Sequence, residues 1–356
     1  MSELIENQRR VLAALKGVKD PELDRDLVDL DMIRDIKVCG PSVELTVVLT
    51  TPACPLRGQI EKSVRDAILA RLPGIETVTV KLDSRVRAGT PVNVPRALHD
   101  VKNVVAIASG KGGVGKSTVS TNLAIALGRC GAAVGLLDAD IHGPNIPMMM
   151  GRPASTVEQV GERIVPVEQH GIRFFSMGFL LQEGQAVIWR GPMLHGAVQQ
   201  FLREIVWGPL DYLIVDLPPG TGDVQLSLCQ TVELAGAVVV STPQDVALAD
   251  VRKGIAMFRQ TGVPVLGIVE NMSTFICPSC HCETDIFLKG GVDRLSKELD
   301  LPVLGSIPLD REVCRAGDEG NPVVVSAPDS ELGRRFLSIA QALAARIAVR
   351  AHAVTH

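Results

Sequence analysis

From residue 101 onward, short apolar runs alternate with segments in which apolar residues recur every three or four positions. The runs predict buried strands and the periodic segments predict helices. Their alternation is typical of an α/β fold with a mostly parallel sheet, right-handed crossovers and helices on both faces. The predicted strands are 104–109, 133–137, 172–176, 212–215, 237–241, 265–269 and 303–306.

The helical pattern is clearest in three segments, 117–130, 192–207 and 331–348. The last segment has an apolar stripe that includes Phe336 and Leu343. Such a helix could lie on a membrane surface, but the predicted sheet needs a final covering helix and no basic face is left over. We therefore expect the segment to pack on the sheet.

Residues 1–85 follow a different pattern, which predicts a small α+β domain. Apolar and polar residues alternate over 43–50 and 78–82, as in strands, and helical stripes precede and follow the first of these segments. Residues 86–100 lack periodicity and contain one glycine and two prolines, so we expect a linker there. A second domain is predicted over 101–350.

Cys54 stands just before the second predicted helix of the small domain. A helix N-terminus can lower the pKa of a thiol and make it reactive. An ordinary cysteine near a helix cap would have the same position, so the sequence leaves both interpretations open.

Composition limits the classes of protein and partner. The chain has 356 residues, is 46% hydrophobic and 21% charged, and has a net charge of −4, as expected for about two packed globular domains. The chain contains no block of basic residues that would predict nucleic-acid binding, and no apolar run long enough to span a bilayer. The first ten residues are polar and show no signal peptide, while eight cysteines favour reduced thiols. We expect a cytoplasmic protein with no nucleic-acid or membrane partner.

A glycine-rich turn between a predicted strand and a predicted helix indicates nucleotide binding. The stretch from Gly110 to Thr118 reads G-x-x-x-x-G-K-[ST], the pattern of a phosphate-binding loop. Glycines let backbone N–H groups close around phosphate oxygens, Lys116 would reach the outer phosphates, and Ser117 would ligate Mg²⁺. The predicted nucleotide-binding residues are Gly110, Lys111, Gly112, Gly113, Val114, Gly115, Lys116, Ser117 and Thr118.

The same glycines also match G-x-G-x-x-G, the pattern of dinucleotide sites. Lys116 and Ser117 argue against a dinucleotide site, because a pyrophosphate fingerprint needs no lysine there. Lys111 is a second lysine near the start of the loop. It is either a solvated loop charge or a group that stabilises phosphate charge across a dimer interface, as an arginine finger would.

Polar residues directly follow three of the predicted strands. In open α/β sheets, ligands gather beyond the carboxyl ends of strands. Asp216 suits a role around Mg²⁺, and Asp138 or Asp140 could position the attacking water. Asn271 could bind the adenine edge, although turns also favour asparagine. The carboxylates could instead cap the helices that follow them.

Cys277 and Cys280 form a C-x-x-C motif, which can bring two thiolates to one metal. The chain has no second such motif, so one subunit supplies an incomplete tetrahedral set. Two chains related by a two-fold axis would supply four thiolates, enough for a shared Zn²⁺ or iron–sulfur cluster. His281 and Cys282 could instead complete a zinc site within one chain, and a redox pair or an inert turn is also possible.

These motifs resemble a known family. The loop from Gly110 to Thr118 is similar to the deviant Walker A loop of the MinD/ParA-like ATPases, whose extra early lysine is Lys111 here. Further segments resemble the Mrp/ApbC iron–sulfur cluster carriers within that group: 138–144, 189–193, 216–223 and 271–280. The motifs at 20–23 and 51–55 resemble a small domain often fused to these carriers.

The resemblance implies a homodimeric ATPase that binds a 4Fe–4S cluster between subunits on Cys277 and Cys280. It would pass this cluster to apo iron–sulfur proteins and work with cluster assembly proteins. Cys282 is not a usual position of the family, which leaves a third thiol ligand open. Two other functions remain as alternatives: a positioning ATPase of the MinD/ParA kind, and an ATPase with a structural zinc.

The resemblance also implies roles in hydrolysis. Lys111 would contact the nucleotide bound to the partner chain, and Lys116 would act on the phosphates of the nucleotide bound to its own chain. Asp140 would be the catalytic aspartate, and Ser117 and Asp138 would lie near Mg²⁺.

Overall fold

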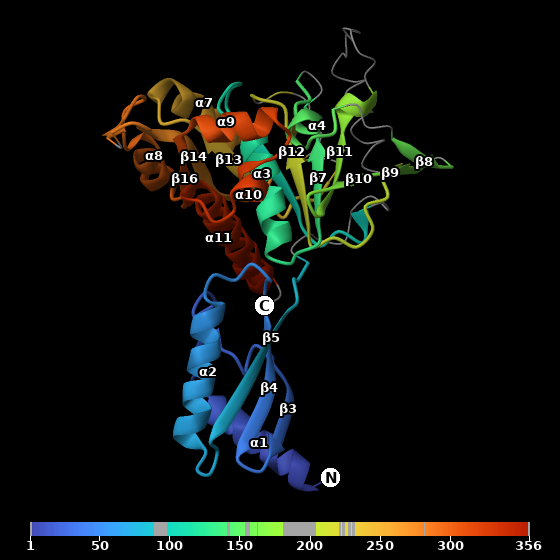
Figure 1. Ribbon diagram of the computed structural model, residues 1–356, viewed down its shortest axis with the longest axis vertical. Coiled ribbons are helices and arrows are strands. Elements are labelled where there is room, and N and C mark those ends of the chain that lie inside the picture. Colours follow the sequence, from blue (N-terminus) through green and yellow to red (C-terminus); the bar gives the residue numbers. More distant parts are fainter. Residues whose placement is uncertain are drawn as a thin grey trace. The chain divides into compact units, whose positions relative to one another are not determined.

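The computed structural model describes residues 2–88, 98–140, 143–153, 157–161, 163–180, 204–220, 222, 225–226, 229, 232–280 and 282–354. The chain folds into two compact units (Figure 1). One contains Met1–Arg87 together with Ala344–His356, and the other is Ala88–Leu343. The domain boundaries expected from the sequence stay a prediction.

Residues 2–87 of the N-terminal unit form a three-stranded sheet, a short two-stranded sheet and two helices. The elements are α1 (Ser2–Leu15), β1 (Lys19–Asp20), β2 (Arg25–Asp26), β3 (Ile33–Cys39), β4 (Ser42–Leu49), α2 (Arg57–Arg71) and β5 (Thr77–Ser84). Strand β4 lies in the middle, antiparallel to β3 and parallel to β5. Every second residue of β4 is buried, and these residues pack with the buried face of α2 in one core.

Strand β3 is not predicted by the sequence because its apolar residues do not alternate regularly. Ile33 and Ile36 are buried with two exposed residues between them, and the pairing with β4 shifts register between Arg34 and Lys37. Asp35 has a φ of 50° at this irregularity. The extra residue breaks the period of two that identifies a strand.

The second unit contains a nine-stranded sheet in the part of the chain that the structure describes. Its strand order is β10-β11-β7-β12-β6-β13-β14-β15, with β16 also paired to β14. Seven of these strands run parallel to one another: β11, β7, β12, β6, β13, β14 and β16. Strands β10 and β15 are antiparallel to their neighbours. The strands of this unit are β6 (Val104–Ser109), β7 (Val134–Asp138), β8 (Glu158–Val160), β9 (Arg163–Val165), β10 (Val167–Gln169), β11 (Ile172–Ser176), β12 (Tyr212–Asp216), β13 (Gly236–Ser241), β14 (Val265–Ile276), β15 (Glu283–Thr284) and β16 (Val303–Leu309).

Helices cover both faces of this sheet, as the sequence predicts. On β6, Val104, Ala106 and Ala108 share one core cluster with residues of α7 and α8, while the alternate residues point to the face where α3 packs. The helices are α3 (Lys116–Arg129), α4 (Ile146–Met149), α7 (Asp245–Gln260), α8 (Gly291–Leu299), α9 (Arg311–Asp318), α10 (Val323–Ser326) and α11 (Glu331–Val354), with a 3₁₀ turn η2 (Met177–Leu180).

The first part of α11 packs on the sheet. Its apolar stripe, including Phe336 and Ile339, is buried. A Cβ added to Gly305 on β16 would lie 2.6 Å from Ile339 Cγ1, so this glycine allows the helix to approach the strand closely. Its last residues, from Ala344, belong to the N-terminal unit.

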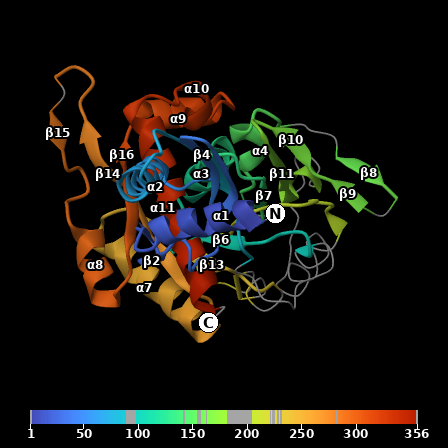
Figure 2. The ribbon, with the colours of Figure 1, turned by 90° about the horizontal axis from the view of Figure 1, so that it is seen from below.

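The main difference from the predicted elements is the length of β14. The predicted strand ends at Val269, but β14 continues to Ile276 and forms a hairpin with β15 that extends outward from this unit (Figure 2). The short strands β8, β9 and β10 are also absent from the prediction. Most of the predicted helix 192–207 lies outside the described residues. None of the described helices is long and apolar enough to span a bilayer.

Candidate functional site

The phosphate loop lies between the end of β6 and the start of α3. Gly113 and Gly115 both have a φ of 80°, a conformation that glycine adopts without strain, and α3 begins directly after Gly115. Gly110 lies against α7, where an added Cβ would lie 2.6 Å from the backbone carbon of Asp250. The loop therefore presents its backbone, followed by the N-terminus of a 14-residue helix, as anion sites require.

Asn271 on β14 holds the loop from the side. Its Nδ2 donates a hydrogen bond of 2.8 Å to the carbonyl oxygen of Val114, and its side chain is buried. A Cβ on Gly115 would lie 2.2 Å from the same Nδ2. The amide that could bind an adenine edge contacts the loop backbone in this structure, and its role toward adenine stays a prediction.

Lys116 and Asp216 form a buried ion pair at the centre of the site. Lys116 Nζ lies 2.6 Å from Asp216 Oδ2, and their side chains are 6% and 0% exposed. Ser117 Oγ donates to the same carboxylate oxygen over 2.6 Å, and Ser120 Oγ donates to Oδ1 over 2.5 Å. Serine and carboxylate oxygens are ligands that Mg²⁺ accepts, so the donor set fits this ion.

Asp138 lies beside this pair at the end of β7. Ser176 Oγ donates to Asp138 Oδ2 over 2.8 Å, and the N–H of Asp140 donates to Oδ1 over 3.1 Å. Burial and the nearby carboxylate of Asp216 raise the pKa of Asp138 to about 8, although these two hydrogen bonds act to lower it. Asp140 Oδ2 lies 3.9 Å from Lys116 Nζ. The side chains of Asp216 and Asp140 thus both lie within 4 Å of one ammonium group.

A cavity of about 180 Å³ opens over the loop. Its lining includes Lys111, Asp140 and Asn145 besides the loop itself. Lys111 is half-buried and lies near the start of the loop, at this cavity. Seven of the predicted nucleotide-binding residues line this cavity: Lys111, Gly112, Gly113, Gly115, Lys116, Ser117 and Thr118. Asp216 and Asp138 are not part of its lining, but Asp216 contacts Lys116 and Ser117 directly.

Sequence reasoning missed two serines that complete the site. Ser120 follows Lys116 by one helical turn, which places its hydroxyl beside the same carboxylate. Ser176 is the last residue of a correctly predicted strand, so the strand-end argument that found Asp138 could have found it.

The Cys277–Cys280 motif forms a tight turn at the tip of the β14–β15 hairpin. The N–H of Cys277 donates to the carbonyl of Cys282 over 3.1 Å and closes the turn. Backbone N–H groups of Cys280 and Ser279 lower the pKa of the Cys277 thiol. Cys277 is half-buried, and Cys280 and Cys282 are exposed. A lowered pKa favours the thiolate, which is the form that binds metal.

Within the described residues, no group of three or more His, Cys, Asp or Glu side chains is placed to hold a metal ion. Cys282 is therefore not gathered with Cys277 and Cys280 into a three-thiol site in this chain. His281, the other residue suggested for a zinc site in one chain, lies outside the described residues. The same holds for the predicted motif at 189–193 and for parts of the segments 138–144 and 216–223.

Cys54 in the N-terminal unit is a buried thiol close to a carboxylate. Its Sγ lies 3.8 Å from Glu22 Oε1, and burial together with that carboxylate raises the pKa of Cys54 to about 12. Asp20 accepts hydrogen bonds from the N–H groups of Glu22 and Leu23, which fixes this turn. The interpretation of Cys54 as a reactive thiolate is therefore wrong for this conformation.

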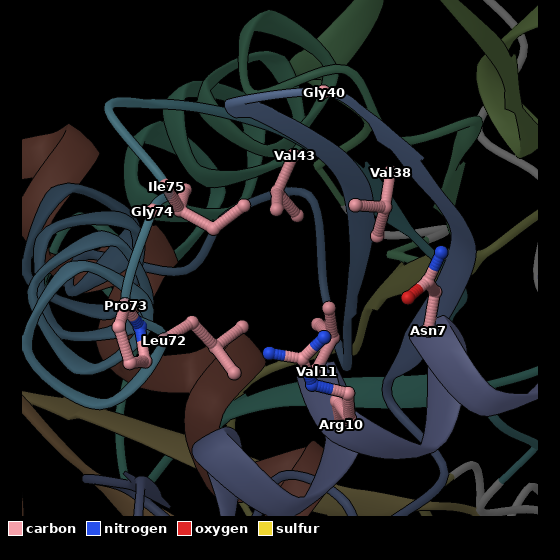
Figure 3. Close-up of a pocket in the computed structure, with 10 residues that line it drawn as sticks. All are labelled: Asn7, Arg10, Val11, Val38, Gly40, Val43, Leu72, Pro73, Gly74 and Ile75. Atoms are coloured by element: carbon pink, nitrogen blue, oxygen red, sulfur yellow. The ribbon is translucent and has the colours of Figure 1, made fainter.

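The N-terminal unit also contains a cavity of about 530 Å³ between α1, the β3–β4 turn and the end of α2 (Figure 3). Its lining combines apolar side chains with those of Asn7 and Arg10, and includes no cysteine, histidine or carboxylate. Its greater volume does not make it the reactive site, because the convergent charged groups lie at the phosphate loop.

The fold and the loop define a P-loop NTPase of the MinD and ParA kind. The structure of MinD from Pyrococcus furiosus matches 67% of this chain and 97% of its own, with a TM-score of 0.51 and 23% identity, which shows the shared fold. A ParA model described as "NUBPL iron-transfer P-loop NTPase" matches residues 100–344. The chain belongs to this family. A second model, "Iron-sulfur cluster assembly protein", matches residues 8–82.

Curated relatives resemble the chain over almost its full length. The "Iron-sulfur cluster carrier protein" of Synechocystis is 51% identical over 96% of this chain and 98% of its own. The protein of the same name from Deinococcus radiodurans is 52% identical over 96% and 95%. A nucleotide-binding protein from Archaeoglobus fulgidus, solved with ADP, is 39% identical, with a TM-score of 0.59 over 67% of this chain and 94% of its own.

Proposed function

We propose that this protein is a cytoplasmic ATP-dependent carrier of iron–sulfur clusters. It holds a 4Fe–4S cluster between two copies of the chain and passes it to apo iron–sulfur proteins, with cluster assembly proteins as further partners. The observation that carries the proposal is the turn at Cys277 and Cys280, which joins a lowered thiol pKa to exposure at the tip of a hairpin. The names of the relatives from Synechocystis and Deinococcus radiodurans support the same cargo.

The incomplete ligand set supports a dimer. The C-x-x-C motif of each chain offers two cysteines, whereas a cubane cluster takes four thiolates. Two turns related by a two-fold axis would supply them. The cluster is cargo in this scheme, so its ligands need exposure for transfer, which the exposed Cys280 provides.

ATP is proposed to bind on residues 110–118. Mg²⁺ would bind at Ser117, with Asp138 and Asp216 around it, and would neutralise phosphate charge. Lys116 would exchange its ion pair with Asp216 for the outer phosphates. Asp140 would position the attacking water, and Lys111 would act on the partner's nucleotide.

Anaerobic reconstitution with iron and sulfide tests the proposal. Iron and acid-labile sulfide are measured in the wild type, Cys277→Ala and Cys280→Ala, with Cys314→Ala as the control because Cys314 lies exposed on α9. We expect cluster in the wild type and the control and loss in the two turn variants. Equal iron and sulfide in all four proteins, or zinc without sulfide in protein made anaerobically, would contradict the carrier function.

A further inference from the structure

One strand connects the phosphate loop with the cysteine turn. Asn271 lies within β14 and binds the Val114 carbonyl, and Cys277 directly follows the last residue of the same strand. Cys277 is six positions after Asn271, at most about 20 Å of extended chain at roughly 3.3 Å per residue. Figure 2 shows this strand running out into the hairpin. A displacement at Asn271 therefore has a direct covalent route to the thiols.

The loop end of this connection is built to change orientation. Val114 stands between Gly113 and Gly115, which both have a φ of 80° and can rotate without a Cβ. Asn271 lies so close to Gly115 that no methyl group fits between them. A rotation of the Val114 peptide consequently meets the Asn271 amide.

A bound phosphate supplies the driving force for such a rotation. Lys116 is two residues from Val114, and its ammonium is held 2.6 Å from Asp216. A phosphate that captures Lys116 competes with this ion pair and draws the loop backbone with it. The two arrangements of Lys116 differ in their interactions with the nucleotide, which any ligand-driven change requires.

The outer half of β14 is less firmly held than the inner half. Residues 268–270 pair with β13 on one side and with β16 on the other. The described pairing with β13 ends at Glu270, and the pairing with β16 then passes from Asn271 directly to Phe275. Met272 has a φ of 55°, a left-handed conformation that is strained for methionine. The irregular segment can therefore take a second conformation at low cost, and it leads straight to Cys277.

We propose that Asn271 couples nucleotide binding at the phosphate loop to the conformation of the Cys277–Cys280 turn. Asn271 is a positioning residue that follows the Val114 carbonyl and moves the outer half of β14. This inference rests on the proposed function, because it explains how a nucleotide changes the grip on a cluster. Its test uses metal-free protein, so that it does not depend on cluster binding.

The test measures the alkylation rate of each thiol by mass spectrometry in the full-length protein, with and without a non-hydrolysable ATP analogue and Mg²⁺. In the wild type we expect the analogue to change the rates at Cys277 and Cys280 by about fivefold or more, the lower range of allosteric coupling. Cys314, which is exposed on α9, serves as the internal reference, and we expect its alkylation rate to stay unchanged. The rates are measured over a tenfold range of protein concentration, because protection by dimer contact depends on concentration.

Asn271→Ala is expected to abolish the effect of the analogue on these thiols at saturating analogue, with occupancy checked by equilibrium dialysis. Asn122→Ala is the matched control: Asn122 donates to the carbonyl of Thr118 in the same region but connects it to Val324 rather than to β14. We expect this control to keep the effect. If Asn271→Ala does not fold, Met272→Gly replaces it, since glycine frees the backbone after Asn271 and should reduce the effect.

Two results would overturn the inference. One is an unchanged thiol rate in wild-type protein with the analogue bound, and the other is a full effect in Asn271→Ala or, in its place, Met272→Gly. Either result with intact cluster binding removes the coupling but keeps the carrier function. A normal nucleotide effect in a protein that takes up no cluster removes the carrier function but keeps the coupling.

Discussion

Lys116 Nζ lies 2.6 Å from Asp216 Oδ2, and both side chains are buried. This pair joins the phosphate loop to the end of β12, the middle of the parallel sheet. The lysine that a nucleotide needs is therefore also a structural partner of the carboxylate expected beside Mg²⁺. We therefore expect changes at Lys116 to affect both nucleotide binding and the stability of the fold.

Lys116→Ala should weaken both nucleotide binding and the fold. From the sequence alone, Lys116→Ala would be expected to keep the fold intact, because a loop lysine supplies charge rather than core packing. In the structure, however, the variant leaves Asp216 as an unpaired buried charge, which typically costs about 3–5 kcal/mol. Asp216→Asn added to Lys116→Ala should recover part of the free energy of unfolding. Urea unfolding followed by tryptophan fluorescence measures it, because both tryptophans, at 189 and 207, belong to this unit. An unchanged stability of Lys116→Ala would contradict the ion pair.

Gly115→Ala should be more destabilising than Gly113→Ala. Both positions have a φ of 80°, so each variant bears about 1 kcal/mol or more of backbone strain. Only the methyl at 115 collides with Asn271, while at 113 no atom lies within 4 Å. The collision breaks a buried hydrogen bond, a further loss of about 1–3 kcal/mol. Equal losses in urea unfolding would show that Asn271 does not press on the loop.

Ser120→Ala should lower magnesium-dependent ATP hydrolysis more than it lowers ADP binding without magnesium. The variant removes the hydrogen bond that orients Asp216 Oδ1, worth about 1.5–3 kcal/mol for a charged acceptor. Turnover and equilibrium dialysis measure the two effects. Thr121→Ala is a control at the next, equally buried position of the same helix, since Thr121 contacts Met149 rather than a carboxylate. A loss shared equally by both variants would argue against a role through Asp216.

The N-terminal unit should lose stability as the pH rises from about 9 to about 12. The folded unit keeps the proton on Cys54, whose pKa is raised to about 12, while the unfolded chain releases it near its ordinary pKa of 9.0. Because the folded state binds more protons in this range, the free energy of unfolding falls with rising pH. Below pH 9 the effect vanishes.

Cys54→Ala should remove this part of the pH dependence, measured as the difference between the two unfolding curves at each pH. In the same wild-type protein at pH 8, iodoacetamide should modify the exposed Cys280 and leave Cys54 intact. Rapid alkylation of Cys54 would show that the buried thiol is accessible.

The sequence predicts the parallel sheet well because six of its strands are continuous apolar runs with clear ends. It stops β14 at Val269 because Glu270 and Asn271 interrupt the apolar run, although β16 and β15 continue to pair with the strand beyond them. Pairing between distant segments is a tertiary effect that a local pattern does not contain. The strand-end rule likewise finds Asp216 but not its contact with Lys116, which depends on how α3 packs on the sheet.

Native mass spectrometry after anaerobic reconstitution shows how many chains hold one cluster. We expect all bound iron and sulfide on a species of two chains that carries one 4Fe–4S cluster, and only cluster-free chains for Cys280→Ala. A single chain that holds the complete cluster, or a two-chain species in which Cys277→Ala and Cys280→Ala retain it, would contradict the claim that two cysteine turns share one cluster.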